Sequence, residues 1–223
     1  GRRHFWEHLL AGQSGISPVE SFDTSRYSVN LGGEVKKFSP KGYVTTLDPD
    51  QIGRASQFAI TAARLALQDA GIDPDGLSAG SAGISMGTTS GEPNQIEQFD
   101  DHYIEQDFEG ISPDFISTYP CHSIAGHVAG ELKFSGSNIM IPAACAAGTY
   151  AISHAFDELR SGRAHFMLAG GANSFSRITY SGFARLLAIA PERCQPFDLN
   201  RKGMVPGEGA AILLRRDAAV SAG

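Results

Sequence analysis

Pro142-Ala-Ala-Cys145-Ala-Ala-Gly-Thr149 joins an apolar segment to a long helical pattern and carries one cysteine. Upstream, residues 138–141 predict a short buried strand. Downstream, residues 146–160 predict a helix, because apolar side chains recur on one face. The apolar positions of that face are Ile152, Ala155, Phe156 and Leu159. The sequence therefore places Cys145 at or beside the N-terminus of a helix, where a strand has just ended.

The position of Cys145 is typical of a nucleophile. Unpaired N–H groups and the helix dipole favour negative charge at a helix N-terminus, and the thiolate is the reactive form of cysteine. The nearest neighbours, all alanine or glycine, leave room for a substrate carbonyl to reach the sulfur. The alternative is a structural role, because cysteine is among the most buried residue types and packs as a small hydrophobe.

The composition is that of an ordinary globular protein, with 42% of the 223 residues hydrophobic and 19% charged. No stretch approaches the roughly 18 apolar residues that a membrane span needs. The formal net charge of −6 argues against a general nucleic-acid surface. Three scattered cysteines, Cys121, Cys145 and Cys194, suit a reducing cytoplasm better than a disulfide scaffold. A zinc site has no support, because no CxxC or HxxxH spacing pairs these cysteines with the seven histidines.

Strand-like and helix-like segments alternate along the chain. Helices are predicted at residues 5–11, 57–70, 94–108 and 122–132, and strands at 81–87, 166–171 and 210–215. This alternation indicates an α/β architecture with a layered sheet. Between Ser174 and Gly209 lies a long stretch rich in glycine, proline, arginine and aspartate, and a connection of that length in a compact domain is usually functional.

Two short glycine motifs suggest other enzyme classes, but neither has the right context. Gly83-Ile-Ser85-Met-Gly87 matches the nucleophile elbow of α/β-hydrolases, yet that serine must open a helix, whereas Ser85 lies within a predicted strand. Gly207-Glu-Gly209 resembles a dinucleotide loop, yet it precedes a strand, whereas a Rossmann loop follows one. We expect this second motif to be a glycine turn where the backbone passes close to another segment.

Several motifs occur in a familiar order. They are Trp6-Glu-His-Leu-Leu-Ala-Gly-Gln-Ser-Gly-Ile16, Phe22-Asp-Thr-Ser25, Ala125-Gly-His-Val-Ala129, Ala144-Cys-Ala-Ala-Gly-Thr149, Met167-Leu-Ala-Gly-Gly-Ala172, Gly182-Phe183, Pro196-Phe-Asp-Leu-Asn-Arg-Lys-Gly203 and Pro206-Gly-Glu-Gly-Ala210. Together they resemble the amino-terminal half of β-ketoacyl synthases, the condensing enzymes of the thiolase fold. The discrete, elongating synthases of the fatty-acid type are the most similar, because modular polyketide synthases usually have serines where this chain has Ala146-Ala147-Gly148.

The resemblance implies an α/β, thiolase-like fold of the layered αβαβα type, with a mixed sheet flanked by helices. Residues 1–223 would be the amino-terminal half of a synthase, without the family's first strand and carboxy-terminal half. The family's two catalytic histidines and its lysine lie in that second half. None of the seven histidines of this chain falls in their motifs, so we expect it to supply the nucleophile alone.

The resemblance also implies a mechanism. Cys145 would accept an acyl group from the phosphopantetheine arm of an acyl carrier protein and form a thioester. A malonyl carrier unit would then lose carbon dioxide, and the resulting carbanion would attack that thioester and lengthen the chain by two carbons. Covalent catalysis divides the condensation into two easier steps, and the backbone N–H of Cys145 would form half of an oxyanion hole. No metal and no further cofactor are expected.

Three substrate-binding candidates follow from the same resemblance. The region around residues 112–126 resembles one that lines the acyl pocket and dimer interface, and Phe115 and His127 are the candidates there. Met204 stands where the family usually has a phenylalanine near its cysteine. Taken alone, a histidine such as His127 within a helical pattern is more typical of a satisfied core or interface residue than of a base. The expected partners are an acyl carrier protein and a second subunit, identical or related, with no nucleic acid.

Two other functions fit the same fold. One is a non-catalytic partner subunit that shapes chain length in a heterodimer; such partners typically lack the cysteine, so Cys145 favours catalysis. The other is a thiolase-fold acyltransferase that loads acyl chains without condensing them. Two catalytic histidines elsewhere in the protein would support condensation, and their loss would support simple acyl transfer.

Overall fold

The computed structural model describes residues 1–77 and 79–216 and divides the chain into two compact units. The sheet unit consists of Ser39–Ser174 and the chain from Gly209 onward, and the small unit consists of Gly1–Phe38 and Phe175–Glu208. Within the described ranges, none of the helices combines the length and the apolar character that crossing a membrane requires.

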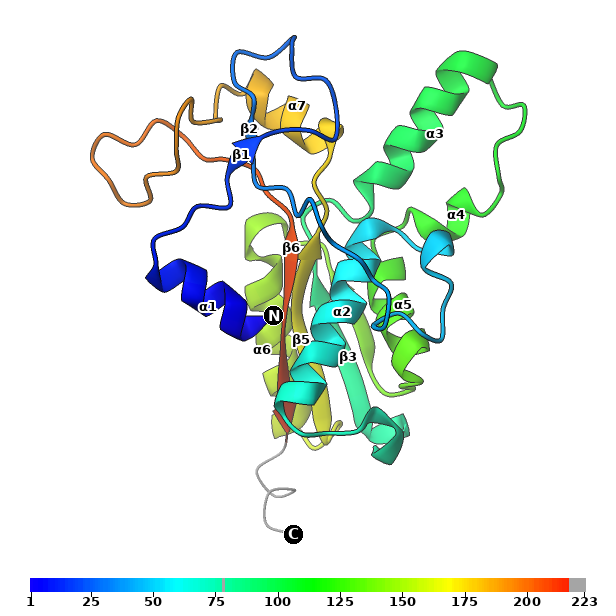
Figure 1. Cartoon of the computed structure of the whole chain (residues 1–223). Coiled ribbons are helices and arrows are strands. Elements are labelled where there is room, and N and C mark those ends of the chain that lie inside the picture. Colours follow the sequence, from blue (N-terminus) through cyan, green and yellow to red (C-terminus); the bar gives the residue numbers. More distant parts are fainter. Residues whose placement is uncertain (78, 217–223) are drawn as a thin grey trace. The chain divides into compact units, whose positions relative to one another are not determined.

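A four-stranded mixed sheet lies at the centre of the sheet unit (Figure 1), in the order β4-β3-β5-β6. β3 (Ala82–Gly87), β4 (Asn138–Ile141) and β5 (Phe166–Asn173) are parallel, and β6 (Gly209–Arg216) is antiparallel to β5. These are the four strands that the sequence predicts, with ends that differ by at most two residues. The parallel strands bring their carboxyl ends to one edge of the sheet, where α/β folds bind ligands.

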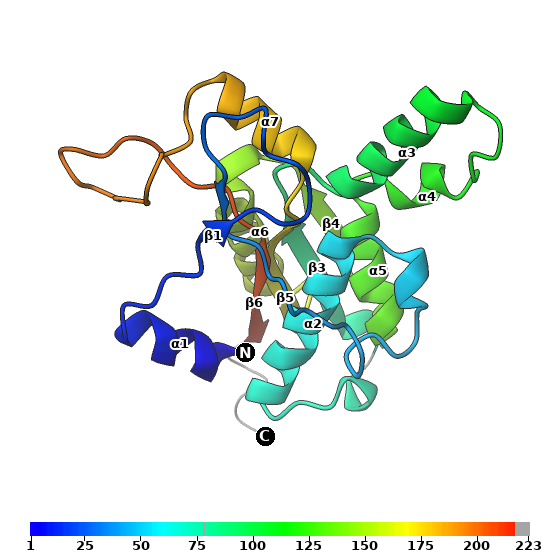
Figure 2. The same cartoon turned by 45° about the horizontal axis from the view of Figure 1, so that its top comes forward.

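Helices cover both faces of this sheet (Figures 1 and 2). α2 (Arg54–Asp69) and α5 (Ser123–Leu132) pack on one face, and α6 (Ala147–Arg160) packs on the other. The sequence predicts all three helices. α2 begins at Arg54 rather than at residue 57, because the carboxylate of Glu92 caps it from another segment.

The side chains of β5 alternate between the two helical layers. Leu168 and Ala172 enter the core beneath α2 and α5, whereas Met167 and Ala169 pack on the α6 side. All four side chains are almost completely buried. Burial of a large side chain such as Leu168 contributes about 1.5–3 kcal/mol, so this strand stabilises both layers of the unit.

One face of β3 carries only small residues. Gly83, Ser85 and Gly87 are alternate residues of the strand and share the face that α6 covers. Ser85 is completely buried, and a Cβ at Gly83 would lie 2.5 Å from the sulfur of Met167. The Gly83-Ile-Ser85-Met-Gly87 motif is therefore a closely packed strand surface and not a hydrolase elbow, as its sequence context predicts.

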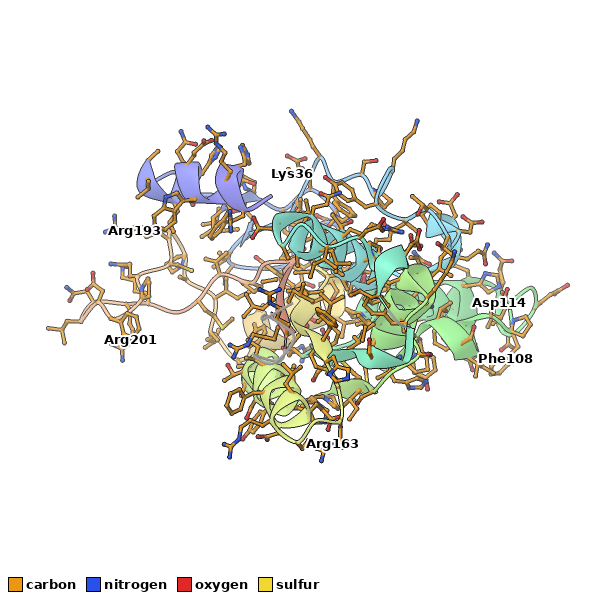
Figure 3. The ribbon with its side chains drawn as sticks, turned by 90° about the horizontal axis from the view of Figure 1, so that it is seen from below. Lys36, Phe108, Asp114, Arg163, Arg193 and Arg201 are labelled. Carbon is orange, nitrogen blue, oxygen red and sulfur yellow. The ribbon has the colours of Figure 1, made fainter. Side chains whose placement is uncertain are left out.

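An arm extends from the sheet unit (Figure 1). It consists of α3 (Pro93–Gln106) and the short α4 (Phe115–Thr118). Figure 3 shows Phe108 and Asp114 toward the outer end of this arm. Pro93 is the one buried residue of α3, so the arm has little core of its own.

Aromatic packing around α7 (Arg177–Arg185) organises the small unit. Phe22, Tyr27, Phe175 and Tyr180 have ring centroids 5.2–6.5 Å apart. The Tyr180 hydroxyl donates a hydrogen bond to a backbone carbonyl, which satisfies its polar end. The remaining elements are α1 (Arg2–Leu10), β1 (Ser17–Pro18) and β2 (Leu31–Gly32).

The Gly207 turn passes close to another backbone segment, as expected. Gly33 and Gly207 form a parallel bridge, and a Cβ at Gly33 would lie 3.3 Å from the Cα of Gly207. Such a close approach favours residues without side chains. The motif is therefore a structural turn that leads into β6 at Gly209.

The sequence does not predict α7, which lies in the long connection between Ser174 and Gly209. A cap signal is present, because the hydroxyl of Ser176 accepts a hydrogen bond from the amide of Thr179 at 3.1 Å. The surrounding glycines and prolines hide this signal in a pattern typical of a loop.

Two burial predictions are also wrong. β4 is only half-buried, because it is an edge strand of the sheet. Phe156 is 43% exposed, because α6 faces the sheet through smaller residues spaced four apart. Those residues are Ala147, Ala151, Ala155 and Leu159.

Candidate active site

The junction between strand and helix at Cys145 is a tight backbone elbow. β4 ends at Ile141, a 3-10 turn covers Ala144–Ala146, and α6 starts at Ala147. Ala144 has a φ of +48°, a left-handed conformation that residues other than glycine seldom adopt. Strain of this kind costs about 1–3 kcal/mol and is concentrated at functional sites. The elbow leaves Cys145 exposed beside the N-terminus of a helix, where the sequence predicts it.

Gly87 lets the elbow lie directly on the sheet, and Gly171 lies beside it on the neighbouring strand. Gly87 and Gly171 are register partners on β3 and β5. A Cβ at Gly87 would lie 2.3 Å from the carbonyl carbon of Ala147, and a Cβ at Gly171 would lie 3.6 Å from the Cα of Gly148. The first turn of α6 therefore packs against strand backbone, and any side chain at Gly87 would displace it.

Polar contacts fix the loop that follows β3. Oδ1 of Asn173, the last residue of β5, accepts hydrogen bonds from Thr88 Oγ1 at 3.0 Å and from the Thr89 amide at 2.9 Å. The amide of Gly91 donates to Thr88 Oγ1 at 3.1 Å. The ends of two parallel strands are thus held together beside the glycines that support the elbow.

The thiol of Cys145 is surrounded by small side chains. Ala144, Cys145 and Ala146 are all exposed, so a carbonyl group can approach the sulfur. The N-terminal N–H groups of α6 and its dipole favour negative charge nearby. An exposed thiol does not fit the buried structural role, and the arrangement suits a thiolate that attacks a carbonyl carbon.

Phe115 lies on α4 at the centre of a row of stacked rings. Its ring centroid is 4.4 Å from that of Phe99 on α3 and 4.6 Å from that of Tyr119. Tyr103 continues the row at 6.3 Å from Phe99. These contacts hold α4 against α3, and a role for Phe115 in substrate binding stays a prediction.

His127 on α5 is half-buried and hydrogen-bonded. Its Nδ1 lies 2.8 Å from Oγ of Ser56 on α2, and the same Oγ lies 2.7 Å from Oε1 of Glu92. Burial lowers the pKa of His127, so the ring is neutral at pH 7. These bonds fit a satisfied core histidine, the interpretation that the helical pattern favours.

Met204 belongs to the small unit. It is 42% exposed and forms a bridge with Ile189. Cys145, Phe115 and His127 belong to the sheet unit. The structure thus describes three of the four predicted site residues within one unit and the fourth in the other.

Sequence-based prediction misses the buried glutamates, of which two accept backbone hydrogen bonds from other segments. Glu131 on α5 accepts hydrogen bonds from Arg64 and from the amides of Thr45, Thr46 and Leu47. Burial raises the pKa of Glu131, but these hydrogen bonds outweigh it and lower the pKa to about 2. The second is Glu92, whose one sequence signal is a carboxylate in the loop that follows a buried strand.

Known proteins share this architecture. The family model for the β-ketoacyl synthase N-terminal domain matches residues 1–219. The chain is 33% identical over 216 residues to 3-oxoacyl-[acyl-carrier-protein] synthase 2 of Vibrio cholerae, covering 94% of this chain and 52% of that protein. It is 30% identical over 222 residues to the chloroplastic 3-oxoacyl-[acyl-carrier-protein] synthase I of Hordeum vulgare, covering 94% and 48%. The chain therefore spans about half the length of the curated relatives it matches.

Solved structures agree. The ishigamide ketosynthase/chain length factor has a TM-score of 0.92 and 33% identity, over 98% of this chain and 55% of that chain. A type II polyketide ketosynthase in complex with its acyl-carrier protein has a TM-score of 0.81 and 26% identity, over 98% and 55%. The mixed sheet, its covering helices and the elbow are thus those of the α/β thiolase-like fold, and the chain belongs to the β-ketoacyl synthase N-terminal domain family.

Proposed function

We propose that the protein containing this chain is a β-ketoacyl-acyl-carrier-protein synthase that elongates acyl chains in fatty-acid or polyketide synthesis, with Cys145 as its nucleophile. One observation carries the proposal: the exposed thiol of Cys145 lies on a left-handed elbow beside the N-terminus of α6. The names of the relatives, which are 3-oxoacyl-[acyl-carrier-protein] synthases, support the same chemistry.

The first step is acyl transfer to Cys145. Its thiolate attacks the carbonyl carbon of an acyl thioester carried on the phosphopantetheine arm of an acyl carrier protein. A new C–S bond forms, the bond to the pantetheine sulfur breaks, and the departing thiolate takes up a proton. The backbone N–H of Cys145 is one donor for the developing oxyanion, and a pre-aimed donor of this kind contributes about 3–4 kcal/mol.

The second step is decarboxylative condensation. A malonyl thioester on a carrier protein loses carbon dioxide, and the resulting carbanion attacks the acyl-Cys145 carbonyl. The bond to Cys145 breaks, the thiolate is regenerated, and the acyl chain is two carbons longer. The step needs no metal and no further cofactor, and we assign its remaining catalytic groups to the complete protein. A reducing cytoplasm keeps such a thiol available.

Substrate-binding roles for Phe115 and His127 in the sheet unit, and for Met204 in the small unit, remain part of this proposal. The carrier protein as partner is supported by the solved complex of a ketosynthase with its acyl-carrier protein.

We also propose a second subunit, identical or related, that pairs along β4. The carbonyl of Ser137 accepts a hydrogen bond from the amide of Ile84 in β3, and that of Ile141 accepts one from Thr88, just after β3. Because such bonds alternate along a parallel strand, the backbone groups of Asn138 and Met140 face the open edge. Four uncharged residues without proline leave this edge available for pairing.

Acylation of the complete gene product tests the nucleophile. Incubation with an acyl carrier protein thioester should add one acyl mass, and peptide mapping should place it on Cys145. The adduct should disappear in Cys145→Ala. The matched control is Cys194→Ala, which removes the other exposed cysteine and should leave the adduct intact. An adduct that persists in Cys145→Ala would overturn the assignment.

Addition of the malonyl carrier protein then separates the possible reactions. Release of carbon dioxide together with a 3-oxoacyl product supports condensation. Turnover of the acyl-Cys145 thioester without that product indicates a non-condensing acyltransferase. A complete protein that takes no acyl group but extends the products of a second synthase subunit would be a chain-length partner.

A further inference from the structure

Glu92 caps a helix to which it does not belong. Its buried carboxylate accepts hydrogen bonds from the amides of Ala55 at 3.0 Å and Ser56 at 2.7 Å, near the start of α2. The N-cap residue is Gly53, and a Cβ there would lie 2.2 Å from the Glu92 carboxyl carbon. The carboxylate therefore occupies the space of an ordinary N-cap side chain.

The same carboxylate is linked to His127 through one hydroxyl group. Ser56 Oγ lies 2.7 Å from Glu92 Oε1 and 2.8 Å from His127 Nδ1. A hydroxyl has one proton to donate. When Ser56 donates to ionised Glu92, the Nδ1–H of His127 must donate to Ser56, so the three groups form one directed chain from α5 to the loop after β3.

This chain anchors the segment that separates the elbow from the arm. The loop of residues 88–92 begins beside Gly87, which supports the first turn of α6, and ends at Pro93, where α3 begins. Asn173 holds its first half through Thr88. Glu92 holds its last residue. Between these two anchors, Gly91 has a φ of +69° and lies against Cys121. A Cβ placed at Gly91 would lie 3.1 Å from the Cβ of Cys121.

We infer that Glu92 is a positioning residue: it ties the base of the α3–α4 arm to α2 and α5 and thereby sets the position of Phe115 relative to Cys145. Its consequence for acyl-chain selection depends on the proposed function, whereas the tether itself does not. A cap for α2 alone could be supplied locally by Asp or Ser at position 53. Because Glu92 lies in the loop after β3, its carboxylate caps α2 and also connects that loop to the helix. A local cap would make no such connection.

A pair of variants separates the cap from the tether. Glu92→Gly removes both. Gly53→Asp combined with Glu92→Gly restores a local cap, because the atoms nearest to a Cβ at Gly53 are those of the Glu92 carboxylate itself. The apparent Tm of the complete gene product should fall by roughly 3–8 °C in the single variant and largely recover in the double variant. If Glu92→Gly does not fold, Glu92→Gln takes its place in these measurements, because glutamine keeps the shape of the side chain and removes its charge.

Alkylation of Cys121 by iodoacetamide, followed by peptide mass spectrometry, reports on the loop without any acyl substrate. We expect its rate to rise about tenfold in the double variant, which corresponds to ~1.4 kcal/mol of lost tethering. Cys194 in the small unit is the internal control and should react at an unchanged rate. Recovery of the apparent Tm together with normal protection of Cys121 would reduce Glu92 to a helix cap and overturn the inference.

Two substitutions of His127 test its part in the hydrogen-bonded chain. The amide of Asn can replace the Nδ1–H donor, so His127→Asn should keep Cys121 protected, whereas His127→Leu should expose it. Equal alkylation in both variants would exclude His127 from the tether.

If the tether holds, the double variant should also change the ratio of long to short acyl adducts on Cys145. A wild-type protein that forms no adduct would contradict the proposed function and leave the alkylation result standing.

Discussion

Gly87 and Ala147 are in direct backbone contact: a Cβ on Gly87 would lie 2.3 Å from the carbonyl carbon of Ala147, the first residue of α6. The central strand and the helix that follows Cys145 therefore meet without a side chain between them. The position of the thiol is set by the geometry of the sheet, and adjustable side-chain rotamers contribute little to it.

Gly87→Ala should consequently misplace the nucleophile. An added methyl group forces strand and helix apart, which typically costs about 1–3 kcal/mol in a packed interior. A displacement near 1 Å can reduce a reaction rate by about a hundredfold. Thermal unfolding and the rate of acyl transfer to Cys145 in the complete gene product measure both effects.

Gly130→Ala is the matched control for that substitution. Gly130 lies on the exposed side of α5, and a Cβ placed there would lie 3.9 Å from Leu47 Cδ2, an ordinary van der Waals contact. The change should leave acyl transfer unaltered and raise stability by about 0.5–1 kcal/mol, because alanine is the better helix former. Equal losses in the two variants would contradict a specific role for Gly87.

The sequence predicts the features of this site that depend on local pattern. The strand at 138–141, the helix after Cys145 and the small residues between them are all visible as periodicity and composition. The cap of α2 is not visible, because Glu92 acts on Ala55 and Ser56 across a gap of more than 35 residues. The positive φ of Ala144 also has no sequence signal, because tertiary packing imposes it on a residue that prefers other conformations.

The buried Glu131 should make stability depend on acid pH. Its pKa of about 2 lies below the ordinary value of 4.5, so the folded state binds its proton less readily than the unfolded state. The resulting stabilisation, roughly 3 kcal/mol, is fully present above about pH 5 and is lost as the pH falls toward 2. Urea unfolding of wild type and Glu131→Gln at pH 7 and at low pH measures this contribution.

The two proteins should differ by several kcal/mol at pH 7 and converge as the pH approaches 2. Arg3→Ala is the control, because it removes an ion pair with Glu7 in which the two side chains are 92% and 57% exposed. Solvent screens such a pair, so its loss should have little effect on stability. A difference for Glu131→Gln that does not change with pH would show that the lost hydrogen bonds, and not the charge, account for the effect.

Phe115→Ala should loosen the arm before the rest of the sheet unit. Phe115 joins α3 to α4 through rings 4.4 and 4.6 Å away, whereas most of the core lies around the sheet. Limited proteolysis should therefore cut residues 106–114 faster with little change in global unfolding. Ile116→Ala is the control, because Ile116 is 72% exposed and lies one residue away. Equal cleavage of the two variants would argue against the stacked rings as the support of α4.

Asn138→Lys should weaken the proposed pairing of subunits along β4. Asn138 is exposed on the edge strand, and a lysine on an edge strand opposes strand pairing because its charge must be desolvated. Light scattering of the complete gene product should show a wild-type dimer and a shift toward monomer in the variant, with unfolding unchanged. Ser153→Lys adds the same charge on the exposed side of α6 and should leave the dimer intact. A dimer that survives Asn138→Lys must use another surface.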